Sequence, residues 1–275
     1  MKTNIAILTL FLLLIGDTFI AAARQNPFTK PQLTNQSEKY KNVVKLSILR
    51  IMNPLHHDLD FGYERVITGY FTVSLSMAVK KPYVPKIIKN NFNTDPKVIN
   101  NSQGLPMATQ SVILSPISGF GFTPELKFYT SGEKNAPRGF YLAPYFKYYR
   151  TSMKAHGKVD FYDPHKQDAS LDVKMIFTEF GGGLQLGYQW VLDNDITIDW
   201  YFLGPRISKF NFDLHFEGNV NDPTYFAQAA DQVKDVFSNF PGNSLTVTTT
   251  SGSLDVNAPF IFPNIRSGIA IGFVF

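Results

Sequence analysis

The C-terminal residues alternate between large apolar side chains and small or polar ones. Positions 265, 269, 271 and 273 are Ile or Phe, whereas the positions between them are mostly Gly, Ala or Arg. A period of two predicts a β-strand with one apolar face. Such a strand belongs either to a soluble β-sandwich or to the wall of an outer-membrane barrel, whose lipid-facing side is apolar.

Seven other segments show the same alternation. Each places apolar residues at every second position, with Gly, Ser, Thr or charged residues between them. These segments are 44–48, 59–64, 71–79, 120–128, 140–148, 184–190 and 196–202. With the C-terminal strand the total is eight, an even number as in bacterial single-chain membrane barrels. The predicted fold class is therefore all-β, an eight-stranded antiparallel transmembrane β-barrel.

The lengths of the connections favour the membrane barrel over the sandwich. Short and long connections alternate along the chain, so they fall on opposite sides of the sheet, and only the first outer connection, 53–58, is short. The short ones are 67–70, 130–139 and 192–195, and the long ones are 80–117, 151–169 and 209–261. Outer-membrane barrels have short periplasmic turns and long outer loops, whereas a soluble sandwich has no reason to sort its loops. We expect residues 42–275 to form a barrel with three long outer loops.

The N-terminus predicts export. Lys2 precedes the apolar run from Ile5 to Ile15, and three alanines follow at 21–23. A run of about ten apolar residues with a small-residue exit is typical of a signal peptide and is too short to span a bilayer. We expect a signal peptide at 1–23 and a periplasmic segment at 24–41. The chain has no cysteine, so its stability depends on a large core or a closed sheet.

The polar faces of the predicted strands would point into the lumen. They carry charges of both signs, and eight strands enclose a space that side chains just fill. Because buried charges persist only when they are paired, we expect a salt-bridged plug. Its members are Lys45, Glu64, Glu125, Lys127, Lys147, Asp199 and Arg266. The same charges could line a narrow ion path, and Glu64 with Glu125 could form an acid–base pair, although pairing with Lys147 or Arg266 is favoured.

Two local features modify the predicted wall. Pro124 and Pro144 interrupt neighbouring strands, and a closed barrel has no free edge for a missing donor, so we expect a paired bulge there. The run Gly181-Gly182-Gly183 resembles a phosphate loop, but no helix follows it. We therefore expect close packing or curvature of the wall at these glycines.

The last long connection predicts a short helix. Asp222 can cap it, Pro223 fits its first turn, and apolar residues then recur at spacings of three and four until Pro241. Its apolar face can pack on its own loops, cover the barrel mouth, lie on lipid or receive a partner. The candidate interaction face consists of Phe226, Ala230, Val233 and Phe237. The segment that follows, 244–256, predicts a β-ribbon.

All five histidines lie in predicted outer connections, with aspartates close in sequence. They are His56, His57, His156, His165 and His215. Imidazole and carboxylate groups are what a zinc site or a hydrolase needs, but no metal-ligand spacing on a helix is present. We therefore assign no metal, no cofactor and no catalytic residue.

Four stretches resemble a known family. DFGYERVITGYFTV, GFGFTPELKFYTSGEKNAPRGFYLAPYFKYYR, FGGGLQLGYQW and NIRSGIAIGFVF are similar to segments of small outer-membrane β-barrel proteins of unknown function from Bacteroidota. The resemblance covers roughly residues 42–79, 118–208 and 261–275. It implies a barrel in contact with outer-membrane lipids, and a terminal aromatic signal, Phe273 and Phe275, for the barrel assembly machinery. It implies no enzymatic activity.

Together these features predict a structural or binding scaffold in the bacterial outer membrane. Its outer loops would form the interaction surface, for a protein or a glycan. The net charge of +4 is mild, and no concentrated basic stripe indicates nucleic acid. A narrow pore or transport component for small solutes is the alternative, and a surface hydrolase is a less favoured third class.

Overall fold

The computed structural model describes nine segments of the chain, all within one compact unit, Ser37–Phe275. They are residues 41–48, 58–84, 96–100, 106–130, 136–162, 167–192, 195–219, 224–238 and 245–275. The predicted signal peptide lies outside them, as does the periplasmic segment up to residue 40. Among the described residues, no helix is both long and apolar enough to cross a bilayer.

The described residues contain eleven strands and the helix α4. The strands are β1 (Asn42–Ser47), β2 (Asp58–Thr68), β3 (Phe71–Tyr83), β4 (Lys97–Asn100), β5 (Pro106–Leu114), β6 (Ile117–Tyr129), β7 (Gly139–Phe161), β8 (Ala169–Val191), β9 (Ile196–Asn219), β10 (Thr246–Thr249) and β11 (Ser253–Val274). Helix α4 spans Tyr225–Ser238.

Eight of these strands form a closed antiparallel ring. Along the ring the order is β1, β2, β3, β6, β7, β8, β9 and β11, and β11 pairs back with β1, where Phe273 lies opposite Val44. These eight strands contain the eight segments predicted from the alternation, and each pairs with its neighbour in chain order. The predicted number of strands in the ring and their antiparallel arrangement are confirmed.

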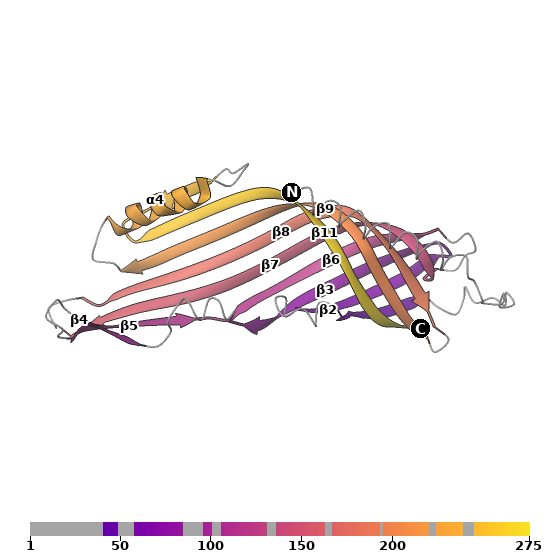
Figure 1. Cartoon of the computed structure of the whole chain (residues 1–275), viewed down its shortest axis with the longest axis horizontal. Coiled ribbons are helices and arrows are strands. Elements are labelled where there is room, and N and C mark those ends of the chain that lie inside the picture. Colours follow the sequence, from indigo (N-terminus) through magenta and orange to yellow (C-terminus); the bar gives the residue numbers. More distant parts are fainter. Residues whose placement is uncertain are drawn as a thin grey trace, which may run out of the picture. The chain divides into compact units, whose positions relative to one another are not determined.

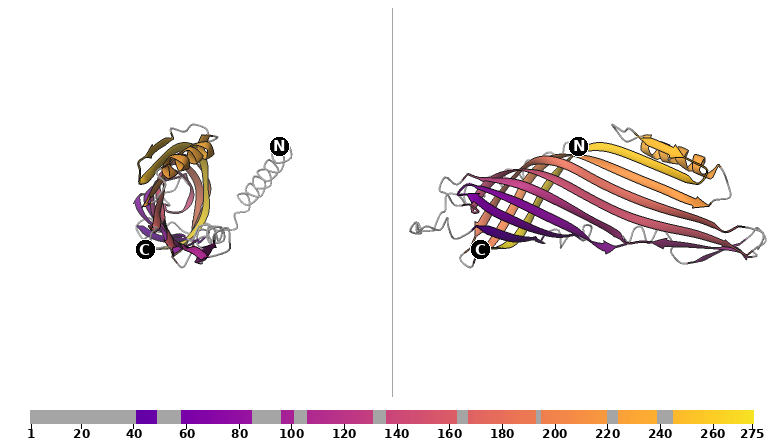
Figure 2. Two further views of the ribbon diagram at one scale, coloured as in Figure 1. Left: turned by 90° about the vertical axis from the view of Figure 1, so that its left-hand side faces the viewer. Right: turned by 180° about the vertical axis from the view of Figure 1, so that it is seen from behind.

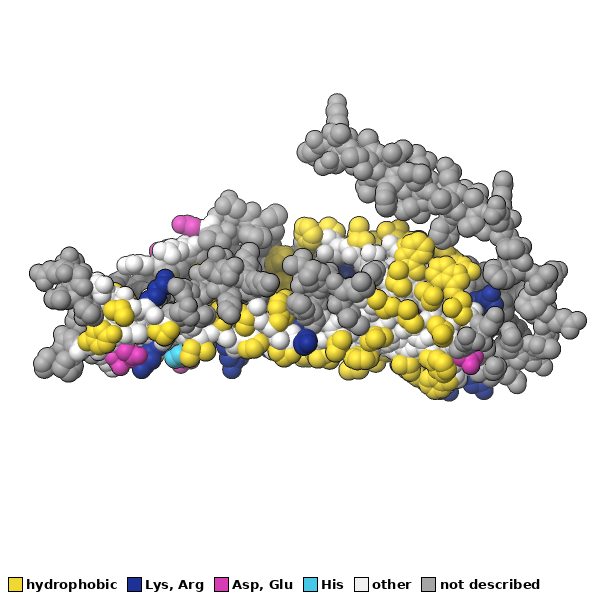
Figure 3. Space-filling view, turned by 60° about the horizontal axis from the view of Figure 1, so that its bottom comes forward, with side chains coloured by type: hydrophobic (Ala, Val, Ile, Leu, Met, Phe, Trp, Pro, Cys, Tyr) yellow, Lys and Arg dark blue, Asp and Glu magenta, His cyan; other side chains and the backbone are white. Residues whose placement is uncertain are grey.

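Burial in the ring follows the strand alternation. In β2, Asp58, Asp60 and Glu64 are buried inside the ring, whereas Leu59 and Phe61 between them are exposed. The other ring strands repeat this pattern, and Figure 3 shows hydrophobic side chains gathered over one stretch of the surface. This distribution is the reverse of a water-soluble protein, in which charged side chains are almost never fully buried unless they are paired.

Four ring strands continue far beyond the ring. β7, β8, β9 and β11 have 22 to 24 residues, whereas β1, β2, β3 and β6 have 6 to 13. We call the continued part the extension; it comprises 151–161, 169–177, 209–219 and 253–260. β5 and β4 add to its edge at β7, and β10 adds to its edge at β11. Figures 1 and 2 show these strands running side by side past the shorter ones.

The extension corrects the predicted long loops. Residues 151–161 and 209–219 are strands, and the connection 80–117 contains the end of β3 together with β4 and β5. The residues between the apolar positions are more often charged there, so these segments lack the apolar outer face expected of a lipid-facing wall and were assigned to loops. The backbone ladder nevertheless continues, with Val159 opposite Ala169 and Ser170 opposite Asn219.

The two strand prolines cause no bulge. The β6–β7 register is the same on both sides of Pro124, because Phe122 lies opposite Tyr148 and Glu125 opposite Tyr145. The predicted paired bulge is therefore wrong. The ladder between these strands lacks a bridge at each proline but keeps its register, so the missing donors interrupt it only locally.

The glycine run allows close contact between strands. A Cβ atom at Gly181 would collide with Ser208, and one at Gly183 would collide with the backbone of Pro205 and with Arg206. This contact between β8 and β9 agrees with the predicted close packing.

The predicted helix and ribbon are both present. β10 and β11 form an antiparallel ribbon with Thr246 opposite Asn257, and α4 packs against it. The helix buries Phe226 and Ala230 against Leu254 and Val256. The predicted capping residues, 222 and 223, lie outside the described residues.

Candidate functional site

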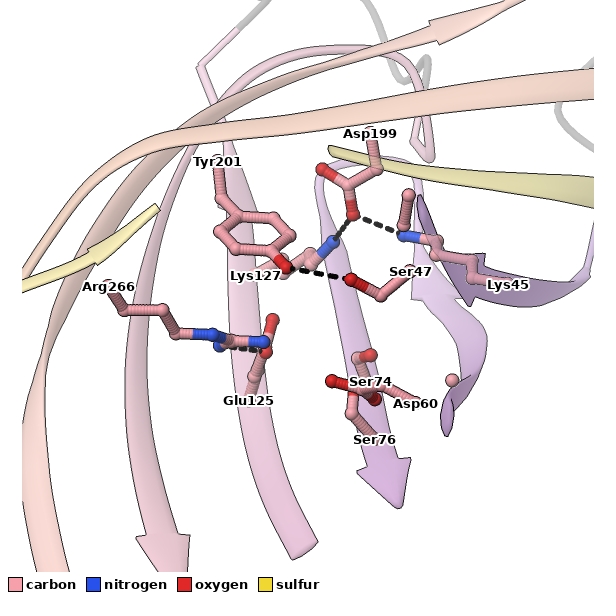
Figure 4. A pocket seen from close by; sticks show the side chains of 12 residues that line it. Lys45, Ser47, Asp60, Ser74, Ser76, Glu125, Lys127, Asp199, Tyr201 and Arg266 are labelled. Carbon is pink, nitrogen blue, oxygen red and sulfur yellow. Dashed lines mark hydrogen bonds and ion pairs between the residues drawn. The ribbon is translucent and has the colours of Figure 1, made fainter. Parts of the chain in front are cut away.

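Four charged side chains from four strands meet inside the ring. Lys45 and Lys127 each place Nζ 2.6 Å from Oδ2 of Asp199. Glu64 contacts Lys45 and lies 3.2 Å from Lys127. Figure 4 shows both lysines directed at Asp199. All four side chains are buried, so two positive and two negative charges neutralise one another.

Neutral side chains complete the hydrogen bonding of this cluster. Thr72 and Tyr129 donate to Oε1 of Glu64, at 2.7 and 2.8 Å. Tyr141 donates to Oδ1 of Asp199 at 2.8 Å, and Oε1 of Gln189 accepts from Lys45 at 2.8 Å. Every carboxylate oxygen of the cluster therefore has a donor, which buried charges need in order to be tolerated.

A second cluster is joined to the first. Arg266 of β11 pairs with Glu125 of β6, and its guanidinium lies 4.6 Å from the ring centroid of Tyr201, in cation–π geometry. Arg266 also donates to Gln185 at 2.8 Å, and Gln185 donates to Tyr141 at 3.1 Å. One hydrogen-bonded chain thus runs from Asp199 to Glu125. With three cations and three carboxylates, the joined clusters carry no net charge.

Three further interior ion pairs, in two groups, lie nearer the extension. Glu179 binds Lys147 at 2.8 Å and Arg206 at 2.7 Å. Lys80 lies 3.2 Å from Asp58, which also accepts a hydrogen bond from Tyr149. The sequence-based set lacks these four partners because they stand at or beyond the ends of the predicted strands.

The seven predicted ionic residues all lie inside the ring. Lys147 pairs with Glu179 instead of Glu64 or Glu125. Glu64 and Glu125 belong to separate clusters, each bound to its own cations, so they form no acid–base pair. The cavity left beside the network measures about 20 Å³, room for about one water molecule. The arrangement is that of a packed plug.

A second candidate site lies on the outer face of the extension, the face opposite α4. We call it the outer groove; its volume is about 310 Å³ and it crosses β8, β9, β11 and β10. Strand pairing aligns its polar side chains in two rows. The groove is lined by Lys174, Ile176, Asp213, Leu214, His215, Thr246, Thr248, Asp255, Val256 and Asn257.

Cross-strand hydrogen bonds organise the outer groove. Nδ1 of His215 lies 2.6 Å from Asp255, and Asn257 donates to Asp213. The hydrogen bond with Asp255, reinforced by Glu217, raises the pKa of His215. Charged, amide and hydroxyl groups on one face can bind a polar ligand. Within the described segments, no three His, Cys, Asp or Glu side chains are placed to hold a metal ion.

The predicted histidine and helix sites change in the structure. His156 pairs with Asp172 and His215 with Asp255, neither being an aspartate close in sequence. Strand register decides these partners, so neighbouring residues gave no signal. The remaining three histidines, at 56, 57 and 165, lie outside the described residues.

The predicted interaction face of α4 needs a correction. Phe226 and Ala230 are buried and Val233 is partly buried against the extension, whereas the side chain of Phe237 is outside the described set. These residues therefore stabilise α4 on its own sheet, and they are not a free surface for a partner.

The predicted assembly signal lies at the closing strand. Phe273 and Phe275 expose about half of their surfaces, 53% and 55%. The carbonyl oxygen of Phe275 accepts a hydrogen bond from the backbone of Asn42 at 3.0 Å. Their recognition by an assembly machinery stays a prediction.

No protein-family model and no curated protein matches the chain. The resemblance to Bacteroidota barrels stays a prediction.

Proposed function

We propose that this protein is an integral outer-membrane β-barrel that acts as a structural or binding scaffold. One observation carries the proposal: the ring buries its charges and exposes its large apolar residues. Glu64 is fully buried, for example, whereas Met77 and Ile207 are 57% and 67% exposed. Soluble monomers rarely expose contiguous apolar patches above roughly 300–600 Å². A lipid bilayer would remove the unfavourable contact between this apolar surface and water.

We call the exposed apolar residues on the outer face of the ring the apolar belt. The height of this belt supports a membrane span. On the outer face of β3, exposed apolar residues continue from Val73 to Val79 and end before Lys81. A transmembrane β-strand needs about 9–11 residues, and Phe71 to Lys81 is a segment of that length. Closure of the ring would leave no unpaired edge within the membrane.

The filled interior favours a scaffold over a pore. The charged network connects opposite walls of the ring, and the cavity beside it measures about 20 Å³. An aqueous path would require several buried ion pairs to separate. Opening them would leave uncompensated buried charges, which is strongly unfavourable.

The extension would then be the interaction surface. Three of its long strands, β8, β9 and β11, form the outer groove together with the added strand β10, and all four supply hydrogen-bonding groups. Because α4 is packed on the opposite face, we assign the interaction to the groove instead of the helix. A glycan or a polar protein segment fits the groove's chemistry.

Gel mobility in detergent tests the barrel directly. The mature protein should migrate faster without boiling than after boiling, because a closed barrel resists unfolding by detergent. A variant with Lys45 and Lys127 both changed to Glu should lose the shift at a lower temperature. Identical mobility of boiled and unboiled wild-type protein would contradict the barrel.

Epitope tags inserted in living cells test orientation. A tag after Ser251, in the turn between β10 and β11, should bind antibody on intact cells. A tag after Leu192, between β8 and β9, should bind antibody only after the outer membrane is permeabilised. Equal labelling of both tags on intact cells would contradict the proposed topology.

A further inference from the structure

Four cations follow directly beyond the apolar belt on its outer face. In three strands, an exposed cation comes two residues after an apolar residue of the belt: Lys81 after Val79, Arg150 after Tyr148 and Lys209 after Ile207. Lys154 lies four residues beyond Arg150 along β7. We call Lys81, Arg150, Lys154 and Lys209 the basic collar; all four are exposed.

The collar lies where the ring passes into the extension. Lys81 is ten residues from the start of β3, Arg150 and Lys154 are eleven and fifteen from the start of β7, and Lys209 is thirteen from the start of β9. β3, β6, β7, β8 and β9 are consecutive in the ring, so the four cations share one arc. Figure 3 shows Lys and Arg side chains next to the hydrophobic surface.

The collar differs from the cations of the interior network because it lacks carboxylate partners. Every cation of the interior network has one, whereas none of the four collar side chains forms an ion pair with any described residue. On the outer faces of β3, β6, β7, β8, β9 and β11, the described carboxylates begin farther out. The first one on β9 is Asp213, four residues beyond Lys209.

We infer that the basic collar binds the phosphate groups of anionic lipid headgroups in the outer leaflet. The inference deepens the proposed function, because it requires the apolar belt to lie in a bilayer. Headgroup phosphates lie at the boundary between hydrocarbon and water, where the collar begins. Exposed Lys and Arg side chains at this boundary attract anionic headgroups, and Arg also forms paired hydrogen bonds with a phosphate. Bound lipid would therefore cover one arc of the barrel preferentially.

Lipid binding to the purified barrel in neutral detergent tests this inference. The probes are diphosphoryl lipid A and the same lipid after removal of both phosphates. We expect the wild-type barrel to bind the phosphorylated form at least about tenfold more tightly, and to lose this preference as salt rises. Inorganic phosphate at equal concentration should not displace the lipid.

Two matched variants localise the effect. Lys81→Gln, Arg150→Gln, Lys154→Gln and Lys209→Gln together should abolish the preference for the phosphorylated lipid. The control removes the same number of exposed charges away from the collar, by Arg65→Gln, Lys97→Gln, Lys158→Gln and Lys234→Gln, and should retain the preference.

Each other outcome has a defined meaning. Equal loss in both variants would overturn the collar in favour of general surface charge. Displacement by inorganic phosphate would mean that an ion site, and not a lipid surface, explains the cations. Heat-dependent gel mobility is measured on every variant: if the shift persists while lipid preference is absent in wild type, the collar fails and the barrel stands. Absence of the shift in the wild-type protein would contradict the barrel itself.

Discussion

The ring and the extension use the same strands but opposite polarity. In the ring, the inner face of β8, β9 and β11 carries Glu179, Ser208 and Arg266. Without a break in register, the same face continues in the extension as Leu171, Leu214 and Val256, which pack against α4. The outer face changes in the reverse sense, from Ile207 to His215 along β9. The strands keep their geometry, and the polarity of each face follows the proposed change from lipid to water.

Removal of one cation from the ring should give the largest loss of stability. Lys127→Met leaves Glu64 and Asp199 with one lysine fewer in a buried site. We expect a loss of about 3–5 kcal/mol, the usual cost of breaking a buried pair, measured by urea unfolding in detergent. The double variant Lys127→Met with Asp199→Asn should recover part of the loss. If the double variant is as unstable as the single one, the charge imbalance is not the cause.

Phe226→Ala tests the extension separately. This change removes the most buried large side chain of α4 and should cost about 3 kcal/mol. We expect the loss to stay local, so α4 and β10 should become sensitive to protease while the heat-dependent gel shift of the ring is unchanged. A matched change on the exposed side of the helix, Gln228→Ala, should leave protease resistance as it is. Loss of the gel shift in Phe226→Ala would show that ring and extension unfold together.

An arginine introduced on the outer face should reduce stability more in the ring than in the extension. Leu75 lies near the middle of the proposed belt and is 43% exposed, so Leu75→Arg should cost about 2–4 kcal/mol in a bilayer. Thr248→Arg, on the outer groove, should cost less than about 0.5 kcal/mol because the site is solvated. Unfolding in lipid vesicles measures both. Equal effects would contradict the placement of the boundary between them.

The smallest predicted effect is a pH dependence of the extension. Asp255 raises the pKa of His215, so the stabilising pair is fully formed below pH 6.5, the unfolded-state value, and is lost as pH rises through the folded-state pKa. Because both side chains are substantially exposed, the contribution is less than about 1 kcal/mol. NMR titration of the imidazole should give a pKa that falls in Asp255→Asn. An unchanged pKa would show that the pair does not form in solution.

The sequence predicted the ring better than the extension for a physical reason. In the ring, lipid and plug impose opposite chemistry on alternate residues, so segments such as 71–79 can be recognised without their partners. In the extension the alternation continues, as in Phe210, Phe212 and Leu214, but the outer face is polar or charged, so the lipid-facing apolar pattern that identified the ring strands is absent. The alternation along each strand identified seven charged residues of the interior. It did not identify their partners, because the register between strands, and not distance in sequence, brings Lys147 to Glu179.

The sequence left the role of α4 open for a related reason. Its apolar spacing identified the helix, yet the same spacing is produced by a face that covers its own sheet. Leu254 and Val256, which bury Phe226, belong to a strand that continues into the ring. Their surroundings in the extension depend on tertiary packing, which spacing alone does not encode.

The short strand β1 closes the ring by pairing with the last strand of the chain, which affects how fast the ring can form. It joins β11 in the ladder, and the backbone contact between Asn42 and Phe275 spans 233 positions. Contacts between such distant residues form slowly, because a long loop must close before they contribute. Until β11 joins the sheet, β1 and β9 each have one unpaired edge. No folding intermediate without β11 can therefore contain a closed ring. Pairing of β11 with both edges converts an open, association-prone sheet into a closed one in a single step.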